Sequence, residues 1–285
     1  MTDVIVIGGG LFGQIIAKSL MNDGRSVTVI DDAQPQAGSG PAACLMKPSW
    51  FSGLGKQVYT PALEELDHLY GVSDIVFTAG KVLHATVHWI RPSLILGYSE
   101  RTPRITHING TVRSVSPERR ITYQDKQRLT MHELTADLVV CAGGVWTERL
   151  FPQYKQTAQK GVAFLQPNAT IATPSITPWA PYRQLVAFNR GDGLWVSDGT
   201  AIKAENWTPD RELASWKRCQ AYLPDDDAAA GGTVQALLGL RPYAKGHKPC
   251  LLEQPNPGIW VASGGAKNGT LAAGFCAHEI RRLTS

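Results

Sequence analysis

The sequence lacks the features of disulfide-rich, metal-binding and membrane-spanning proteins. Its five cysteines include no CxxC pair, and an odd count does not suit a disulfide framework. The seven histidines form no HxH or HExxH pattern, so we expect no metal site. The apolar run at residues 4–7 is too short for a signal-peptide core or a membrane helix, and no other stretch is long and apolar enough to be a membrane helix. These absences predict a protein of a reducing, cytoplasmic compartment with no membrane partner.

The chain also has no internal repeat, no low-complexity tract and no dense basic run. Its formal net charge is +4, from 28 Lys and Arg against 24 Asp and Glu, and the basic residues are spread along the chain. Such a balance is compatible with an anionic substrate or a polyanion and indicates neither. With 285 residues, of which 43% are hydrophobic and 18% charged, the chain is predicted to bury a substantial core in one or two domains.

The first 32 residues carry the most informative pattern. The segment at 3–8, which is β-branched on the consecutive positions 4–7, predicts a buried parallel strand, and Gly8, Gly10 and Gly13 then complete a GxGxxG motif. Residues 14–22 have apolar side chains at helical spacing, and a second strand at 26–30 ends on two acids. Strand, glycines, helix, strand and acid in this order predict a βαβ dinucleotide-binding unit.

The chemistry of this unit follows from its geometry. Gly8 permits the tight turn, Gly10 lets a pyrophosphate approach the backbone, and Gly13 lets the helix pack on the strand, so the phosphates meet the helix N-terminus. Asp31 is predicted to accept hydrogen bonds from the adenosine ribose, which disfavours NADP, whereas the motif does not separate FAD from NAD. The cofactor-binding residues predicted here are Gly8, Gly10, Leu11, Phe12, Gly13, Asp31 and Asp32.

Four later segments decide between the two dinucleotides. They are a small-residue loop at 39–48, strand-like residues at 108–112 that continue through 121–123, an apolar strand that runs into a glycine turn at 136–146, and a strand, glycine turn and helix start at 257–271. Together with the N-terminal unit, these segments resemble the D-amino-acid oxidase family of FAD-dependent oxidoreductases, which includes glycine oxidase and sarcosine oxidase. The weakest match lies at about residues 155–230.

The resemblance implies FAD as cofactor and an α/β fold with two parts. A discontinuous Rossmann-like FAD-binding domain is expected at 1–75, 104–152 and 232–285, and a smaller antiparallel-sheet substrate domain at 76–103 and 153–231. A helix N-terminus in the last segment would stabilise negative charge on the reduced flavin. The further cofactor-binding residues that the resemblance implies are Ser39, Ala43, Cys44, Val112, Ala142, Gly143, Gly264, Gly265, Lys267, Asn268, Gly269 and Thr270.

The substrate end of the site is predicted from fewer residues. Arg241, in a Leu-Arg-Pro tripeptide similar to that of the family, is expected to form a bidentate pair with a substrate carboxylate. Lys267 and Lys47 are the family-implied candidates for helping the flavin react with oxygen, and we do not choose between them. For all three, the alternative is an ordinary surface side chain. Cys44 is interpreted as a small buried side chain and not as a covalent flavin link.

These residues predict an enzyme that oxidises a C–N bond in an amine or amino acid carrying a carboxylate, giving an imine that hydrolyses. One branch of the family performs this chemistry on a glycine unit attached to a modified nucleobase in DNA or tRNA, which leaves an aminomethyl base and releases glyoxylate. We keep that alternative open, because five arginines are available to form a basic cluster: Arg101, Arg104, Arg113, Arg119 and Arg120. The partner is then a small amine, or a nucleic acid that carries it; the oligomeric state stays open.

Two alternatives belong to other classes of protein: a flavoprotein that only binds a partner, and an NAD-dependent dehydrogenase. An arginine placed to bind a carboxylate, Arg241, favours an enzyme over a protein that only binds a partner. The C-terminal glycine turn favours a flavin over NAD. In the less well matched middle of the chain, we expect strands at 161–165 and 193–197, a Pro-rich loop at 173–181 and a helix at 210–222. Residues 225–232 are interpreted as a linker, and the short strand-like run at 81–90 suggests a trimmed substrate domain.

Overall fold

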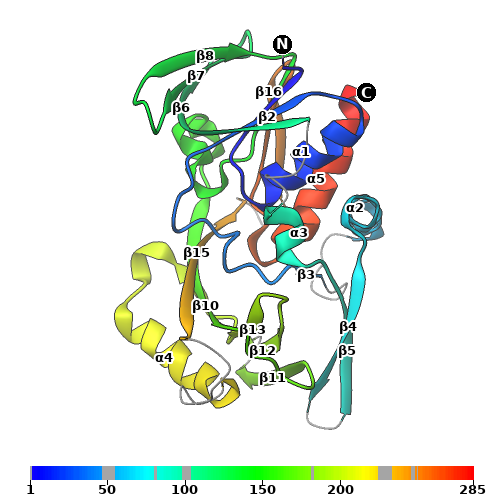
Figure 1. Cartoon of the computed structure of the whole chain (residues 1–285), viewed down its shortest axis with the longest axis vertical. Coiled ribbons are helices and arrows are strands. Elements are labelled where there is room, and N and C mark those ends of the chain that lie inside the picture. Colours follow the sequence, from blue (N-terminus) through cyan, green and yellow to red (C-terminus); the bar gives the residue numbers. More distant parts are fainter. Residues whose placement is uncertain are drawn as a thin grey trace.

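A computed structural model describes residues 2–46, 55–79, 82–97, 104–180, 183–223, 233–244, 248 and 250–285. They are organised around two sheets, which lie above and below one another in Figure 1. The first sheet has the order β16-β17-β9-β1-β2-β6-β7-β8. Its strands are β1 (Val4–Ile7), β2 (Val27–Asp31), β6 (Ile105–Val115), β7 (Arg120–Asp125), β8 (Met131–Thr135), β9 (Leu138–Cys141), β16 (Leu251–Asn256) and β17 (Ile259–Ser263).

The centre of the first sheet is parallel and buried on both faces. β1 pairs with β2 on one side and with β9 on the other, β2 continues to β6, and β9 continues to β17, all in parallel. Every residue of β1, β9 and β17 is buried, which explains why their sequences are continuous apolar runs and do not alternate. This order of strands confirms the predicted α/β, Rossmann-like fold class.

Helices cover one face of this sheet. α1 (Leu11–Asn22) and α5 (Gly269–Thr284) lie side by side, and α2 (Gly55–Tyr70) packs on α5 (Figure 1). Their shared core includes Ile15, Leu20, Leu66 and Leu271, all at or below 1% exposure. A short helix, α3 (Pro92–Leu96), packs beside α1. The first and last segments of the chain are therefore neighbours, as the two glycine-turn motifs require.

The second sheet has the order β14-β10-β13-β12-β11-β4-β5-β3, and β15 also pairs with β10. The strands predicted at 161–165 and 193–197 are present and pair antiparallel, with Phe164 opposite Val196 and Leu165 opposite Trp195. The predicted helix is α4, which covers Pro209–Cys219. The strands are β3 (Leu45–Met46), β4 (Ser73–Ala79), β5 (Val82–Trp89), β10 (Thr157–Pro167), β11 (Ser175–Ala180), β12 (Arg183–Asn189), β13 (Gly193–Ser197), β14 (Ala201–Lys203) and β15 (Gln235–Tyr243).

The prediction of a Pro-rich loop at 173–181 is wrong. Residues Ser175–Ala180 form β11, which pairs antiparallel with β12 and has a register shift between Pro178 and Ala180. Among the described residues, the other edge of β11 meets β4 only at Ser175, opposite Thr78. No described strand on that edge pairs with Pro178, and a strand tolerates proline, which lacks an N–H, at such an unpaired edge.

β15 joins the two sheets. It pairs with β10 from Thr157 opposite Tyr243 to Leu165 opposite Gln235, yet it also bridges Ala37 through Leu240, and Gly265 through Tyr243. Our sequence-based assignment placed residues 232–285 entirely with the FAD-binding part, and the pairing of β15 with β10 puts this strand in the second sheet. The division into domains at the boundaries given above stays a prediction.

Among the described residues, no helix is long and apolar enough to cross a membrane. The described His, Cys, Asp and Glu side chains form no group of three placed to hold a metal ion.

Candidate functional site

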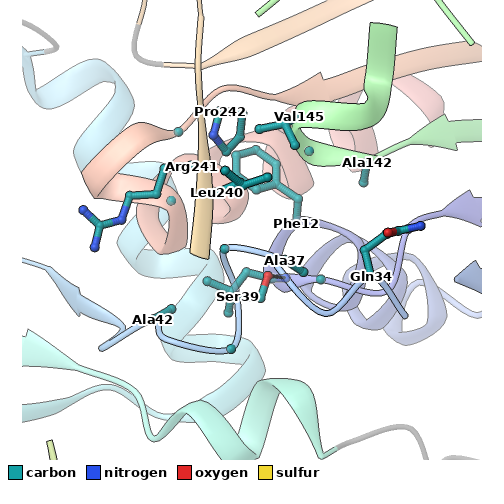
Figure 2. Close-up of a pocket in the computed structure, with 18 of the residues that line it drawn as sticks. Phe12, Gln34, Ala37, Ser39, Ala42, Ala142, Val145, Leu240, Arg241 and Pro242 are labelled. Atoms are coloured by element: carbon teal, nitrogen blue, oxygen red, sulfur yellow. Dashed lines mark hydrogen bonds between the residues drawn. The ribbon is translucent and has the colours of Figure 1, made fainter. Parts of the chain in front are cut away.

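A cavity of about 760 Å³ opens between the two sheets. Its walls include Ile7, Asp31 and Ala142, at the ends of β1, β2 and β9, where parallel sheets bind their ligands. The first turn of α5 and residues 37–45 line it as well, and strands of the second sheet contribute Gln184, Trp195 and Ser197. Figure 2 shows Arg241 at one end of the view and Gln34 and Ala142 at the other.

Glycines bring the backbones of β1, α1 and β9 together. Gly8 has a left-handed φ of +99°, and a Cβ built there would lie 2.6 Å from the carbonyl oxygen of Ala142. A Cβ at Gly13 would lie only 1.8 Å from the carbonyl oxygen of Gly8. No other residue type fits these two positions without moving backbone, so the turn keeps the shape that a pyrophosphate requires.

The N-terminus of α1 lines the cavity, and the Ser39 side chain lies against its first turn. The Ser39 hydroxyl accepts a hydrogen bond from the backbone N–H of Leu11 at 2.9 Å, and a Cβ at Gly10 would lie 2.7 Å from that hydroxyl oxygen. Residues 37–42 thus lie against the helix end, as Figure 2 shows for Ala37 and Ser39. Free N–H groups and the helix dipole make this a place for phosphate oxygens.

The two predicted acids have different surroundings at the end of β2. Both Asp31 and Asp32 line the cavity. The Asp32 carboxylate accepts a hydrogen bond from the Gln34 amide at 2.6 Å, whereas the Asp31 carboxylate lies against Gly9, whose built Cβ would be 3.1 Å from Oδ2. Asp31 is therefore in the place that the βαβ unit assigns to the ribose-binding acid.

The C-terminal glycine turn faces the N-terminal one. Gly265, Lys267, Asn268, Gly269 and Thr270 line the cavity, and a Cβ at Gly265 would lie 3.1 Å from the Phe12 ring. The first N–H groups of a helix have no acceptor within it, and the N-cap residue of α5, Asn268, makes no side-chain capping hydrogen bond to them. The end of the cavity at α5 is therefore suited to an anionic group.

Cys44 lies in the cavity wall with a left-handed φ of 53° and 3% exposure. Burial raises the pKa of its thiol to about 11. A hydrogen bond with Thr270 and the positive charge of Arg190 lower this pKa, but by less than burial raises it. We expect Cys44 to resist alkylation by iodoacetamide in the native protein at pH 8, because the thiolate is the nucleophile and the thiol stays protonated until the pH approaches 11. Peptide mass analysis of native and unfolded protein checks this; rapid native labelling of Cys44 would contradict it.

Arg241 presents a charged fork to the cavity. It is half-buried on β15, lines the cavity, and makes no hydrogen bond or ion pair with any described residue. Burial lowers the pKa of its guanidinium, and the nearby Tyr243 and Asp198 oppose this shift. Arginine remains protonated in proteins, so its N–H donors are available to an anion in the cavity.

The nearby carboxylate of Asp198 is already compensated by other groups. It is fully buried, and Arg218 of α4 holds one oxygen with N–O distances of 2.7 Å from Nε and 2.6 Å from a terminal nitrogen. Thr200 donates to it from its backbone N–H at 2.9 Å and from its hydroxyl at 2.8 Å. Burial raises the pKa of Asp198, but these hydrogen bonds outweigh it and the pKa is lowered. Asp198 therefore does not neutralise Arg241.

Arg218→Ala is expected to lower the free energy of unfolding by about 3–5 kcal/mol at pH 7, because it leaves the buried Asp198 charge without its cation. A carboxylate with a depressed folded-state pKa contributes stability above its unfolded pKa near 4, and the contribution is lost as the pH falls through the folded pKa. The difference between variant and parent should therefore shrink in acid. Urea unfolding at pH 7 and at pH values below 4 measures it, with Arg282→Ala, which breaks an exposed pair with Glu279, as a control costing at most about 1 kcal/mol.

The structure brings together most of the predicted site residues. Those that line the cavity are Gly8, Gly10, Leu11, Phe12, Asp31, Asp32, Ser39, Ala43, Cys44, Val112, Ala142, Gly143, Arg241, Gly265, Lys267, Asn268, Gly269 and Thr270. Gly13 and Gly264 stand behind the wall and shape the two turns, with Gly264 at a φ of +81°. Lys47 lies outside the described residues.

Sequence reasoning missed several cavity residues. Gln34, Val145, Trp146 and Arg149 follow predicted strands, so their closeness to the motifs was a usable signal. The second-sheet residues Gln184, Val186, Trp195 and Ser197 carry no motif, and only the tertiary fold brings them to the cavity.

Comparison with known proteins agrees with this site. Residues 100–283 match the family described as FAD dependent oxidoreductase (DAO). A Caulobacter vibrioides tRNA 5-methylaminomethyl-2-thiouridine biosynthesis bifunctional protein is 38% identical over 80 residues, and this match spans 27% of the chain and 14% of that protein's length.

Solved structures agree at the level of the fold. Iminodiacetate oxidase from a Chelativorans species has a TM-score of 0.68 and 15% identity, with 99% of this chain and 95% of that chain covered. Glycine oxidase from Bacillus cereus has a TM-score of 0.67 and 17% identity, covering 99% and 94%. The predicted family, FAD cofactor and oxidoreductase class are confirmed. The chain belongs to the DAO family of FAD-dependent oxidoreductases.

Proposed function

We propose that this enzyme oxidises a C–N bond next to a carboxylate, in a glycine-like amine or amino acid. The observation that carries the proposal is Arg241: a guanidinium without a partner among the described residues, in the same cavity as the segments expected to bind FAD. A planar carboxylate matches the two-pronged donor geometry of arginine. The cavity thus combines a place for the cofactor with a place for an anionic substrate.

The proposed cofactor contacts follow the shape of the cavity. The Gly8–Gly13 turn and the N-terminus of α1 would hold the pyrophosphate, Asp31 would bind the ribose, and the α5 N-terminus would meet the flavin ring. Bound FAD would supply the oxidant, taking a hydride equivalent from the carbon beside the nitrogen, and the imine product would hydrolyse to a carbonyl compound and an amine. We retain Lys267, which lines the cavity, and Lys47 as candidates for promoting reaction with oxygen.

The residues of the chain would act mainly by orientation. Arg241 fixes the carboxylate and so limits how the adjacent carbon can turn. Among the described residues that line the cavity, only Asp31 and Asp32 are acidic, and both stand at the end of β2 expected to bind ribose. The substrate end then offers no counter-ion for an ammonium, and we expect the amine to react in its neutral form. Five free, buried cysteines support our expectation of a reducing, cytoplasmic setting.

Anaerobic flavin bleaching tests the proposal. The purified protein is mixed under nitrogen with glycine, sarcosine, iminodiacetate and D-amino acids in turn, and with the methyl ester of each. The expected result is loss of the oxidised-flavin absorbance with at least one free carboxylate and a much slower loss with its ester. Equal bleaching by acid and ester would refute the role of Arg241.

A second candidate substrate is a glycine unit attached to a nucleobase. The match to the tRNA-modifying Caulobacter protein supports it, since the same Arg241 would hold the glycine carboxylate. The arginines considered for nucleic-acid contact are partly engaged within the protein: Arg119 donates to the Ala136 carbonyl, and Arg120 lies 3.9 Å from Glu133. Arg101 lies outside the described residues. Bleaching by a carboxymethylaminomethyl-modified nucleoside or polynucleotide, and by no free amino acid, would favour this candidate.

A further inference from the structure

We propose that Gly161 on β10 is a positioning residue for Arg241. Because Gly161 has no Cβ, the guanidinium of Arg241 can lie close against β10 at this residue, and this sets where a substrate carboxylate binds. The inference rests on the proposed carboxylate-binding role of Arg241.

The contact is close enough that a methyl group does not fit. A Cβ built at Gly161 would lie 3.1 Å from Cζ and 3.2 Å from a terminal nitrogen of Arg241, and 2.9 Å from the carbonyl oxygen of Thr200. Non-bonded carbon atoms are in favourable contact at about 3.5–4.0 Å. Gly161 is buried, and its φ lies outside the left-handed region. Glycine is therefore needed at this position because there is no room for a side chain, and not because of its backbone conformation.

The strand register explains how Arg241 comes to lie there. Gly161 stands opposite Gly239, and Gln159 stands opposite Arg241. Residues opposite one another and residues two apart share a face, so Arg241 is the diagonal neighbour of Gly161 on the same face. With no side chain at Gly161, the long side chain of Arg241 can cross the strand pair.

The second glycine of this pair serves the cofactor side. A Cβ at Gly239 would lie 2.5 Å from Pro41 and 3.1 Å from the Cα of Gly38. The backbone N–H of Leu240 also donates to the Gln36 carbonyl at 2.9 Å. One face of the β10–β15 pair thus has residues 36–41 packed at Gly239 of β15 and the Arg241 side chain packed at Gly161 of β10. Figure 2 shows Arg241 and Leu240 on β15 above Ala37 and Ser39.

A methyl group added at Gly161 would press on the Thr200 carbonyl oxygen and on the Arg241 guanidinium, so Arg241 would have to move together with a small shift of backbone at Thr200. The Thr200 atom at the point of contact is its backbone carbonyl oxygen. Thr200 is held in place by two hydrogen bonds to the buried Asp198, and Arg218 binds Asp198 in turn. The guanidinium has no such ties to described residues and is the end of a flexible side chain. The methyl group would therefore displace the guanidinium into the cavity and misplace its donors.

The test is a double-mutant cycle of Gly161→Ala and Arg241→Ala, read as the Kd of methoxyacetate from the flavin absorbance change. Methoxyacetate keeps the carboxylate of sarcosine and replaces the amine with an ether, so it binds without being oxidised by the same route. Gly161→Ala is expected to raise this Kd about tenfold or more, with FAD still bound. In the Arg241→Ala background, Gly161→Ala should raise the Kd of methoxyacetate no further. The Kd of the uncharged methyl methoxyacetate should be the same in Gly161→Ala as in the parent protein.

A matched control separates positioning from loss of stability. Val162→Ala, on the next residue of β10, removes methyl groups from a core on the opposite face and should lower Tm without changing the Kd. If Arg241→Ala weakens binding and Gly161→Ala does not, or if the two effects add, the positioning role is overturned while the proposed function stands. If Arg241→Ala has no effect, or the parent protein binds no carboxylate, the proposed function falls as well.

Discussion

Replacing Arg241 with alanine is expected to weaken binding of a carboxylate-bearing substrate about a hundredfold while FAD remains bound. Removing one partner of a hydrogen-bonded charge pair in a desolvated site costs about 2–5 kcal/mol, and 1.4 kcal/mol corresponds to a factor of ten. The effect should be found in KM and in the Kd of the carboxylate. It should be largely absent with the methyl ester, which carries no charge for the fork to bind.

Two further variants define what Arg241 contributes. Arg241→Lys keeps the charge and loses the two-pronged geometry, so we expect its Kd to fall between those of the parent and of Arg241→Ala. Arg211→Ala removes an exposed arginine of α4 and controls for the change in net charge. Stopped-flow flavin reduction over a range of substrate concentrations measures all three. Equal losses in Arg241→Ala and Arg211→Ala would contradict a specific carboxylate contact.

Gly13→Ala is expected to abolish the purification of yellow, FAD-bound protein. The new methyl group would lie 1.8 Å from the backbone carbonyl oxygen of Gly8, and it is attached directly to the helix backbone and cannot turn away, so α1 must move away from β1. Overpacking of this kind typically costs about 1–3 kcal/mol and more where backbone cannot yield. It also moves the helix N-terminus from the place where the phosphates bind. The ratio of flavin to protein absorbance measures the loss.

A graded series keeps this prediction testable if Gly13→Ala does not fold. Gly10→Ala meets only the hydroxyl of Ser39, the end of a side chain, so we expect it to fold and to bind FAD more weakly. Gly24→Ala, just beyond the other end of α1, meets nothing within 4 Å and has the disadvantage of a left-handed φ of +91°. It should lose about 1 kcal/mol of stability and keep its FAD. Undiminished FAD binding by Gly10→Ala and Gly13→Ala would refute the proposed cofactor contacts.

The cofactor end of the site was predictable because its signals are local. The turn after β1 needs glycines at fixed spacing, and both the strand before it and the helix after it have their own periodicity. The C-terminal turn at Gly264 and Gly265 repeats this logic, and the two turns meet because parallel strands end at the same edge. Arg241 was predicted from a tripeptide by resemblance, without any indication of what surrounds it.

The substrate end was not predictable to the same degree because its residues are brought together by long-range pairing. Gln184, Trp195 and Ser197 reach the cavity only through the order of strands in the second sheet, which no short motif encodes. The strand at Pro178 was missed because its tolerance of proline depends on the second edge of β11, which in the described part of the chain pairs with β4 only at Ser175. Gly161 carries no pattern at all, since its role depends on a diagonal neighbour eighty residues later in the chain.

Single-turnover product analysis tests the central claim most directly. The FAD-bound protein is mixed under nitrogen with the carboxylate that bleaches it, and the 2-oxo acid formed is quantified against the flavin reduced. The account predicts one 2-oxo acid per flavin, which is glyoxylate when the substrate carries a glycine unit, together with one equivalent of the released amine. Purification of the folded protein without FAD, or flavin reduction without any carbonyl product, would contradict it.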